Sequence, residues 1–284
     1  MKSLFSITLA MIIIILSFTI SYANNENEST EFVKYYYNSD YSESLSLNEL
    51  DKVKENQKQS SQFSLPKHII GEDSRQQVNP NNSPYSRVVL LLSGYDEDND
   101  NDIDNWYPGT GFMIYNNIMI TTAHNMFSHT YGVNAKEMRI YVKNNSNNFN
   151  TTYYYPYSWV LSTAYTSSFD SNYDWCVVQT QNNIGTSTGW FGYSTASSSN
   201  RNVYLSGYPT DHSYFQYSAA GIMNSISSYR VSHNVDSYSG QSGAPLYDSN
   251  GYVYAIHTGG DSSLNYGCRI TSSIVAIIND YKNN

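Results

Sequence analysis

The 284-residue sequence has few of the features that identify several classes of protein. Only 14% of its residues are charged, the net charge is -9, and no Lys/Arg-rich run follows the first residues, so nothing indicates a nucleic acid or another polyanionic partner. Beyond residue 23 no apolar run is long enough to cross a bilayer. The only cysteines, Cys176 and Cys268, each lie in an apolar stretch, so a disulfide of an exported protein and two separate buried thiols are both open.

The N-terminal region has the pattern of an export signal followed by a polar segment. Lys2 precedes an apolar stretch over residues 9–20, and Ser21-Tyr22-Ala23 is the small-x-small pattern that signal peptidase prefers. We therefore predict a signal peptide over residues 1–23 and a secreted, extracellular protein; a membrane anchor is disfavoured because the apolar run is short of a full span. Residues 24–67 are polar and predict a pro-segment without a core of its own, or otherwise a disordered tail or linker.

After this segment, short apolar runs alternate with Gly, Asn, Asp and Ser turns, a pattern that predicts an all-β sandwich or barrel. The predicted strands cover residues 87–92, 111–115, 118–121, 138–142, 175–180, 203–205, 244–247, 252–256 and 268–271. Only residues 272–281 have helical spacing, and they predict a closing C-terminal helix with Ser272 or Ser273 as its cap. The apolar face of this helix consists of Ile274, Ile277, Ile278 and Tyr281.

The motif Gly240-Gln241-Ser242-Gly243 indicates a nucleophilic serine. A serine hydroxyl attacks a peptide carbonyl only if a base removes its proton, a third group orients that base, and backbone N–H groups receive the developing oxyanion. His124 follows the β-patterned run that ends in Thr121-Thr122-Ala123, and Asp174 precedes the apolar run at residues 175–180. These residues are the candidate base and the candidate orienting acid.

The order of the three residues along the chain selects among the folds that carry such a triad. His, Asp, Ser is the order of chymotrypsin, whereas α/β-hydrolases have Ser, acid, His and subtilisins have Asp, His, Ser. The Gly-x-Ser-x-Gly elbow of the hydrolases is also missing, because residue 244 is Ala. Both competing folds are therefore disfavoured.

Each candidate residue has a competitor in the sequence. His129 could be the base, but only His124 directly follows the strand-terminal Thr-Ala pair. Asp170 competes with Asp174, which heads an apolar strand where a buried carboxylate would lie. Two further acids are less suited, because Asp236 is close to Ser242 in sequence and Asp211 lies in a proline-containing turn. Ser242 itself could be an ordinary turn serine.

From about residue 68 to the end, the sequence resembles the glutamyl endopeptidase family of bacterial secreted serine proteases. Single motifs are weak, but their collinear recurrence over some 200 residues is specific. The motifs that carry the resemblance are His68-Ile69-Ile70-Gly71-Glu72-Asp73-Ser74-Arg75, Thr110-Gly111-Phe112-Met113-Ile114, Thr122-Ala123-His124, Asn172-Tyr173-Asp174, Gly189-Trp190-Phe191-Gly192-Tyr193, Leu205-Ser206-Gly207-Tyr208-Pro209, Gly240-Gln241-Ser242-Gly243 and Ala255-Ile256-His257-Thr258.

The resemblance implies a chymotrypsin-like double β-barrel with a C-terminal helix and a site in the cleft between the barrels. We expect the first barrel at residues 68–182 and the second barrel with the helix at residues 183–284. By matched position, Ser242 is the nucleophile, His124 the base and Asp174 the group that orients it, and the amides of Gly240 and Ser242 form the oxyanion hole.

The resemblance also implies cleavage after Glu, and possible acceptance of Asp. It places His257 and Thr258, with the hydroxyl of Ser237, in the pocket that binds the substrate carboxylate, and it places the mature amino terminus, produced by cleavage near Lys67-His68, beside that pocket. Asp236 leaves a trypsin-like preference for basic residues open, because an acid at the base of this pocket selects Lys and Arg.

The distribution of glutamates gives mild support for Glu specificity. From residue 68 onward the sequence has three Glu against thirteen Asp, while residues 24–67 hold six Glu. A protease that cuts after Glu would be selected to spare itself, and a Glu-rich pro-segment would be disposable. Lys and Arg are also sparse after residue 68, so drift in composition explains both trends equally well.

The run Asp96 to Asp104 has carboxylates at alternate positions, as calcium-binding loops do. The Gly and Glu that such loops carry at positions six and twelve are replaced by Asn101 and Tyr107, which favours a solvated acidic loop over a calcium site. We expect no cofactor, protein or peptide substrates, no nucleic-acid or membrane partner, and a monomer. The competing class is a non-catalytic protease homologue that acts as a binding module, and it is disfavoured because no triad position is substituted.

Overall fold

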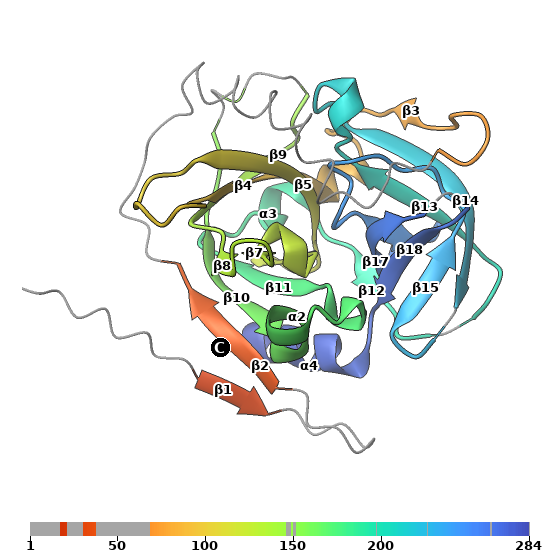
Figure 1. Ribbon diagram of the computed structural model, residues 1–284. Helices are drawn as coiled ribbons and strands as arrows, with labels where there is room; N and C mark the ends of the chain where they lie inside the picture. The colour runs from red at the N-terminus through yellow and green to blue at the C-terminus, as the bar shows by residue number, and fades with distance from the viewer. Residues whose placement is uncertain are drawn as a thin grey trace, which may run out of the picture.

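The computed structural model describes residues 18–21, 31–37, 69–145, 149, 152–196, 198–225, 227–261 and 263–283. Two lobes of β-structure lie side by side, and the lobe that contains β4, β5 and β6 is followed in the chain by the lobe that contains β13 to β18 (Figure 1). None of the helices in these residues is both long and apolar enough to span a membrane. The predicted signal peptide lies outside the described residues, apart from β1.

The first sheet has the order β1-β2-β10-β11-β6-β5-β4-β9. In that order its strands are Phe18–Ser21, Glu31–Tyr36, Pro156–Ser162, Cys176–Thr180, Ile118–Thr121, Asn105–Met113, Val88–Tyr95 and Glu137–Val142. An isolated bridge between Ile140 of β9 and Tyr154, just before β10, brings the two ends of the path from β10 to β9 together. The strands from β10 to β9 therefore curve into the first barrel.

The second sheet has the order β12-β17-β16-β13-β14-β15-β18 and closes on itself, because β18 pairs with β17 as well as with β15. In that order its strands are Gly192–Tyr193, Tyr252–Gly260, Pro245–Tyr247, Arg201–Gly207, Tyr217–Ser225, Arg230–His233 and Asn265–Arg269. The pair β7 (Phe127–Ser128) and β8 (Val133–Asn134) forms a separate small sheet. The architecture confirms the predicted all-β double barrel.

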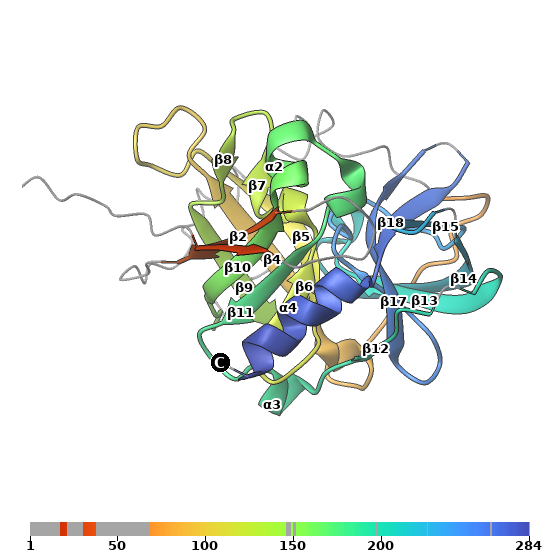
Figure 2. The same cartoon turned by 90° about the horizontal axis from the view of Figure 1, so that it is seen from below.

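Short helical segments connect the strands. They are the 3-10 turns Tyr85–Arg87, Ala123–Asn125, Ser171–Tyr173 and Thr210–His212 and the helices α2 (Thr163–Ser168), α3 (Gly185–Thr188) and α4 (Ser272–Asn283). Helix α4 buries the predicted apolar face and lies against the first barrel beside β11, where Ser158 donates a hydrogen bond to the Tyr281 hydroxyl (Figure 2). Its cap is not Ser272 or Ser273, because the helix already begins at Ser272; Thr271 instead accepts the Ile274 N–H at 3.4 Å.

Every predicted strand overlaps an observed one, but β2, β10, β14 and β15 were not predicted. Strand β14 mixes small residues with glycine and β15 is only four residues long, so neither has a clear run of β-forming residues, whereas β10 starts at a proline and contains a short run, Trp159-Val160-Leu161, that the prediction missed. Strand β2 lies in the segment for which no contribution to a core was expected, yet Phe32 is buried in the first barrel's core. The two-residue strand β3 (Gln76–Gln77) pairs with β14 of the second sheet.

Cys176 and Cys268 are free thiols, and both are buried. Cys176 lies in β11 and Cys268 in β18, so they belong to different barrels. Burial raises the pKa of each thiol, which keeps both protonated and unreactive. The protein therefore has two separate buried thiols and not a disulfide between them.

Candidate active site

The antiparallel pairing of β6 with β11 brings His124 and Asp174 together. Thr121 at the end of β6 lies opposite Cys176 at the start of β11. The turn that carries His124 follows the end of β6, and Asp174 precedes the start of β11. Because these two strand ends are paired, His124 and Asp174 lie at the same edge of the sheet. Residues that are 50 positions apart in sequence become neighbours through strand register.

Both carboxylate oxygens of Asp174 contact His124. One accepts the backbone N–H of His124 at 3.0 Å, and the other lies 2.8 Å from the ring atom Nδ1. Because an ionised carboxylate only accepts hydrogen bonds, the proton of a neutral imidazole is held on Nδ1 and the lone pair is left on Nε2. Asp174 is buried, whereas the imidazole is partly exposed. The carboxylate therefore orients the ring through its Nδ1 side, and the ring stays accessible to solvent.

The loop that carries Ser242 lies between β15 and β16 and depends on two glycines. Gly240 and Gly243 have φ angles of +89° and +90°, which L side chains rarely adopt. A Cβ atom at position 243 would lie 2.0 Å from the Thr110 carbonyl oxygen, and one at position 240 would lie 2.5 Å from the Tyr208 carbonyl oxygen. The motif glycines are therefore required by conformation and by space.

The first barrel holds this loop by its carbonyl groups. The Ser242 carbonyl accepts hydrogen bonds from the Thr110 N–H at 2.9 Å and from the Asn125 side-chain amide at 3.0 Å, and the Gly240 carbonyl accepts the Thr110 hydroxyl at 2.7 Å. Within the described part of the chain, the backbone N–H groups of Gly240 and Ser242 have no hydrogen-bond acceptor. Two amides in this arrangement are available for an external oxygen.

A cavity of about 580 Å³ collects the predicted site residues. It is lined by His124, Asp174, Ser237, Gly240, Ser242, His257 and Thr258, which come from both barrels. The rest of the wall is largely aromatic and includes Tyr95, Tyr107, Phe127, Tyr131, Tyr165 and Phe169. A cavity with apolar walls and a few polar groups is typical of a site that binds an organic substrate.

His257 lies at the inner wall of this cavity and is paired with a second histidine. Its Nδ1 atom is 3.1 Å from Nε2 of His233, and both side chains are buried. Burial lowers the pKa of His257 to about 3, with a further contribution from His124, and burial lowers the pKa of His233 well below its usual value. Both rings are therefore neutral near pH 7.

Asp236 binds the N-terminal segment that contains Ile70 and Ser74. Its carboxylate is buried and accepts the N–H of Ile70 at 2.7 Å, the N–H of Ser74 at 2.8 Å and the Ser74 hydroxyl at 2.6 Å. Asp236 is not among the described residues that line the cavity. The carboxylate therefore holds the segment around Ile70 and Ser74 and does not line the cavity.

Three residues that compete with the triad in the sequence, His129, Asp170 and Asp211, are engaged with partners of their own. His129 packs edge-on against the rings of Tyr165 and Phe169, with ring centroids 4.8 and 4.6 Å apart. Asp170 accepts the N–H of Asn172 at 2.9 Å and caps the turn before Asp174. Asp211 forms an ion pair with Arg75 at 2.7 Å.

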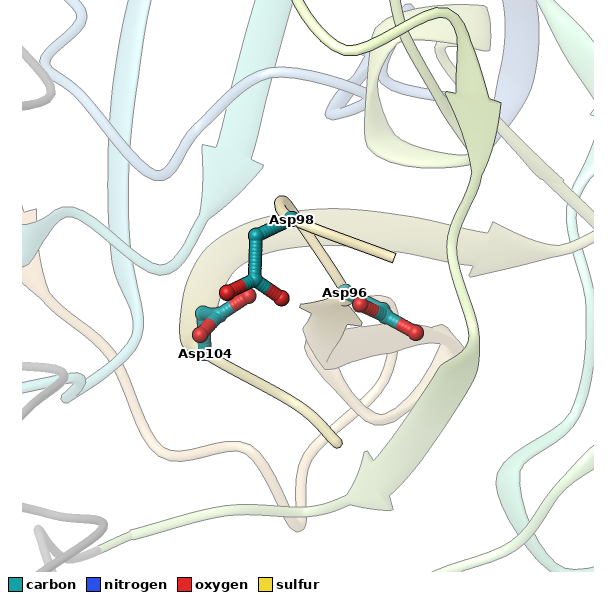
Figure 3. Close-up of side chains that lie close together, drawn as sticks. All are labelled: Asp96, Asp98 and Asp104. Atoms are coloured by element: carbon teal, nitrogen blue, oxygen red, sulfur yellow. The ribbon is translucent and has the colours of Figure 1, made fainter. Parts of the chain in front are cut away.

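The acidic loop between β4 and β5 places one carboxylate oxygen each of Asp96, Asp98 and Asp104 within 4.8 Å of one another. Figure 3 shows these three side chains close together. This is the group of described residues that could hold a metal ion. Lys136 already binds Asp96 at 3.1 Å, and Asp104 accepts the N–H of Glu97 at 2.7 Å. Lys136, which lies outside the loop, thus offsets part of the charge of the loop.

The sequence analysis missed three residues of the site: Thr110, Asn125 and His233. Thr110 and Asn125 act on Ser242 across the two barrels, and His233 lies in the unpredicted strand β15. Thr110 belongs to a motif that carried the resemblance, and Asn125 directly follows His124, so both had a signal in the sequence. His233 had none, because its partner is 24 residues away on another strand.

The match to a known family covers His124, Asp174 and Ser242 of this site. The family described as trypsin-like peptidase domain matches residues 109–256. A protein named extracellular metalloprotease from Bacillus subtilis (strain 168) is 30% identical over 224 residues, which are 74% of this chain and 68% of the relative. The glutamyl endopeptidase of Bacillus licheniformis is 30% identical over 237 residues, which are 76% of this chain and 70% of the relative.

The chain belongs to the trypsin-like peptidase family. A solved Glu endopeptidase in complex with MPD superposes on the peptidase with a TM-score of 0.68 and 22% identity, covering 76% of this chain and all of the other. The protease Anisep from Arthrobacter nicotinovorans gives a TM-score of 0.59 at 15% identity, over 71% of this chain and 96% of the other. The peptidase therefore has the chymotrypsin-like fold and is a serine endopeptidase similar to glutamyl endopeptidases.

Proposed function

We propose that the peptidase is secreted and hydrolyses peptide bonds after Glu by a Ser242-His124-Asp174 triad. The observation that carries the triad is the double contact of Asp174 with His124, which leaves Nε2 of the ring as the free base in the cavity lined by Ser242. The predicted signal peptide is the basis for secretion. The reaction requires no cofactor.

In the proposed reaction, Nε2 of His124 takes the hydroxyl proton of Ser242 as the serine oxygen adds to the scissile carbonyl. The carbonyl oxygen becomes an oxyanion and accepts the N–H groups of Gly240 and Ser242. The imidazolium then gives its proton to the leaving amine, which departs as the acyl-enzyme forms. Water repeats the sequence, with His124 again as base, and releases the carboxylic acid and the serine.

Glu specificity is supported by the neutral donors in the pocket. If the His233 Nε2–H donates to Nδ1 of His257, the proton of His257 is on Nε2, where it is available to a substrate carboxylate. The hydroxyls of Ser237 and Thr258 line the same cavity. A substrate carboxylate can accept hydrogen bonds from such donors, whereas a lysine ammonium, which only donates, would find no negatively charged acceptor among them.

The position of Asp236 supports the same specificity and suggests how the enzyme is activated. Because Asp236 is occupied by Ile70 and Ser74, it is not available to a basic substrate side chain. Asp236 also immediately precedes Ser237 of the pocket. The bonds to Ile70 therefore tie the chain directly after the predicted cleavage near Lys67-His68 to the pocket wall, which supports a zymogen that is processed at this point.

The name of the Bacillus subtilis relative raises metal-dependent hydrolysis as a competing outcome. A catalytic zinc requires three protein ligands, and among the described residues the group of three potential ligands is Asp96, Asp98 and Asp104. No histidine belongs to that group. The donor set thus favours the serine mechanism.

One assay separates these outcomes. Purified peptidase is incubated with matched peptides that carry Glu, Asp, Lys or Phe before the scissile bond, with and without a fluorophosphonate and, in parallel, a metal chelator. We expect cleavage after Glu. The fluorophosphonate should abolish this activity and label the peptidase covalently, and it should not label the Ser242→Ala variant. Cleavage after Lys but not Glu would overturn the specificity. Inhibition by chelator without labelling would overturn the triad, and no cleavage or labelling would indicate a binding module.

A further inference from the structure

Strand β2 fills an open seam in the first barrel. The second barrel closes through the pairing of β18 with β17, whereas the first barrel closes by the single bridge Ile140–Tyr154. Beyond that bridge, residues 158–162 of β10 pair with residues 32–36 of β2, which lies along the free edge of β10 (Figure 1). This strand comes from the predicted pro-segment and lies outside the matched family region at residues 109–256.

The side chains of β2 pack as core residues do. Phe32 is only 1% exposed, and its ring centroid lies 5.4 Å from that of Trp175, the neighbour of Asp174 in sequence. Tyr35 stacks on Trp159 at 5.8 Å with an interplanar angle of 15°. Removing the strand would empty the space beside Trp175 and expose one face of Trp159.

Further contacts extend along the strand to helix α4. The Lys34 ammonium lies 4.4 Å from the centre of the Tyr281 ring. The Tyr37 N–H donates to the Tyr157 carbonyl at 3.0 Å and continues the ladder past the end of β2. Strand β2 therefore contacts β10, Trp175 just before β11, and helix α4.

None of the described residues of β2 lines the active-site cavity. A pro-segment that inhibits by occupying the substrate site must leave before the enzyme can work. A strand that is bound at the back of the barrel has no such requirement, because substrate and strand use different surfaces. Its apolar contacts and backbone ladder favour retention.

We propose that residues 31–37 remain bound as a strand of the first barrel after the chain is cut between Tyr37 and Ile69, so that the processed peptidase consists of two chains held together without a covalent bond. The inference rests on the processing step of the proposed function. Three glutamates, at positions 43, 49 and 55, lie between these two points of the sequence, so the proposed specificity would itself separate the strand from the protease domain. Strand β1 is not part of the inference, because it lies within the predicted signal peptide.

The retained strand also supports the active site from behind. Phe32 lies opposite Ser162, whose hydroxyl accepts the Ala164 N–H at 3.2 Å and caps helix α2. Tyr165 of that helix and Phe169 directly after it line the cavity. Loss of the strand is expected to loosen this wall of the cavity as well as the neighbourhood of Asp174.

The test separates retention of the strand from self-processing. A recognition site for an unrelated protease replaces residues 50–56 of the full chain in the inactive Ser242→Ala background, and the purified protein is cut and passed through size exclusion and native mass spectrometry. We expect the short chain to co-elute with the protease domain after the cut and to separate from it only in denaturant. Dissociation of the short chain from the freshly cut protein under native conditions would overturn the proposal.

Two matched variants in the same strand test the contacts. Phe32→Ala removes the buried ring, and Tyr36→Ala removes a side chain that is 47% exposed. We expect the short chain of the Phe32→Ala protein to dissociate at least about tenfold more readily and that of Tyr36→Ala to stay bound; equal behaviour of the two variants would overturn the proposed contact. Because the cut is made by another protease, a failure of Glu specificity or of self-processing leaves this result interpretable.

Discussion

The buried carboxylate of Asp236 holds the backbone N–H of Ile70 at 2.7 Å, although the two residues are 166 positions apart. This contact links the start of the protease domain to the wall of the pocket that contains Ser237 and His257. A single acid that could have selected basic substrates instead fixes the position of the N-terminal segment. Under the proposed function, substrate choice then depends on the histidine pair and on the hydroxyl groups of the pocket.

Replacing this acid tests the assignment. Asp236→Asn keeps the size of the side chain but removes the charge that strengthens the bonds to Ile70 and Ser74, so we expect a loss of about 1.5–3 kcal/mol in the free energy of unfolding. The preference among peptides with Glu, Lys or Phe should stay the same, as measured by kcat/KM. Selective loss of cleavage after Lys would show that Asp236 contacts the substrate.

The triad predicts two different losses of rate. Ser242→Ala should lower kcat by a factor on the order of 10⁶, and Asp174→Asn by about 10⁴, because the amide favours the wrong tautomer of His124. Asp170→Asn is the matched control: it weakens the cap of the turn beside Asp174, and kcat should be unchanged. A drop of kcat in the Asp170→Asn variant that equals the drop in Asp174→Asn would contradict the assignment.

The pocket histidine should act on one class of substrate. His257→Leu removes a donor to the substrate carboxylate, so kcat/KM for a Glu peptide should fall about 10- to 100-fold, the equivalent of one hydrogen bond to a charged group. Cleavage of a Phe peptide should change little. His233→Gln should give a smaller loss with the same substrate pattern, since His233 acts through the orientation of His257. Equal losses for Glu and Phe peptides would indicate a general packing defect.

The depressed pKa of His257 predicts a dependence of stability on pH. The unfolded chain binds a proton near the ordinary pKa of 6.5, while the folded protein does so only near 3. Between these values the unfolded state binds more protons, so stability falls as the pH is lowered, by about 1.4 kcal/mol for each pH unit. Urea unfolding of the Ser242→Ala protein between pH 7 and pH 4 measures the slope, and adding His257→Gln should reduce it; the buried His233, whose pKa is also lowered, contributes with the same sign. An unchanged slope would show that His257 does not cause it.

The conformation of the nucleophile loop predicts a further contrast. Gly243→Ala forces a Cβ atom to within 2.0 Å of the Thr110 carbonyl at a φ of +90°, so activity should be lost and the melting temperature should fall. Gly132→Ala is the matched control, because Gly132 also has a positive φ, +69°, but nothing lies within 4 Å of the added atom. Its cost should be limited to the backbone strain, and kcat should be retained. Similar kcat values for the two variants would mean that the close approach to Thr110 does not hold Ser242.

The sequence predicts those parts of the fold and site whose signal is local. The strand before His124 and the strand after Asp174 are continuous apolar runs, and the glycines around Ser242 lie within one motif. The pairing of His233 with His257 and of Asp236 with Ile70 depends on strand register and on chain connections between distant segments, which no local pattern encodes. Asp236 illustrates the difference, because its place in the sequence left a role in the pocket open, and its contacts with Ile70 and Ser74 could not be read from any local pattern.

Strand β2 was missed for a related reason. Residues 32–37 are rich in β-forming side chains, but the overall polar composition of residues 24–67 outweighed this short run in the prediction. The burial of Phe32 also depends on a free strand edge that forms only when the first barrel is assembled. The composition of a segment indicates whether that segment can form a hydrophobic core by itself. It does not indicate whether one of its strands can pack into the core of a neighbouring domain.

The bonds from Thr110 and Asn125 to the Ser242 carbonyl cross from one barrel to the other. Separation of the two lobes would therefore displace the loop that carries Ser242. A ligand that binds between the lobes, away from Ser242, is then expected to inhibit the peptidase allosterically while both lobes stay folded.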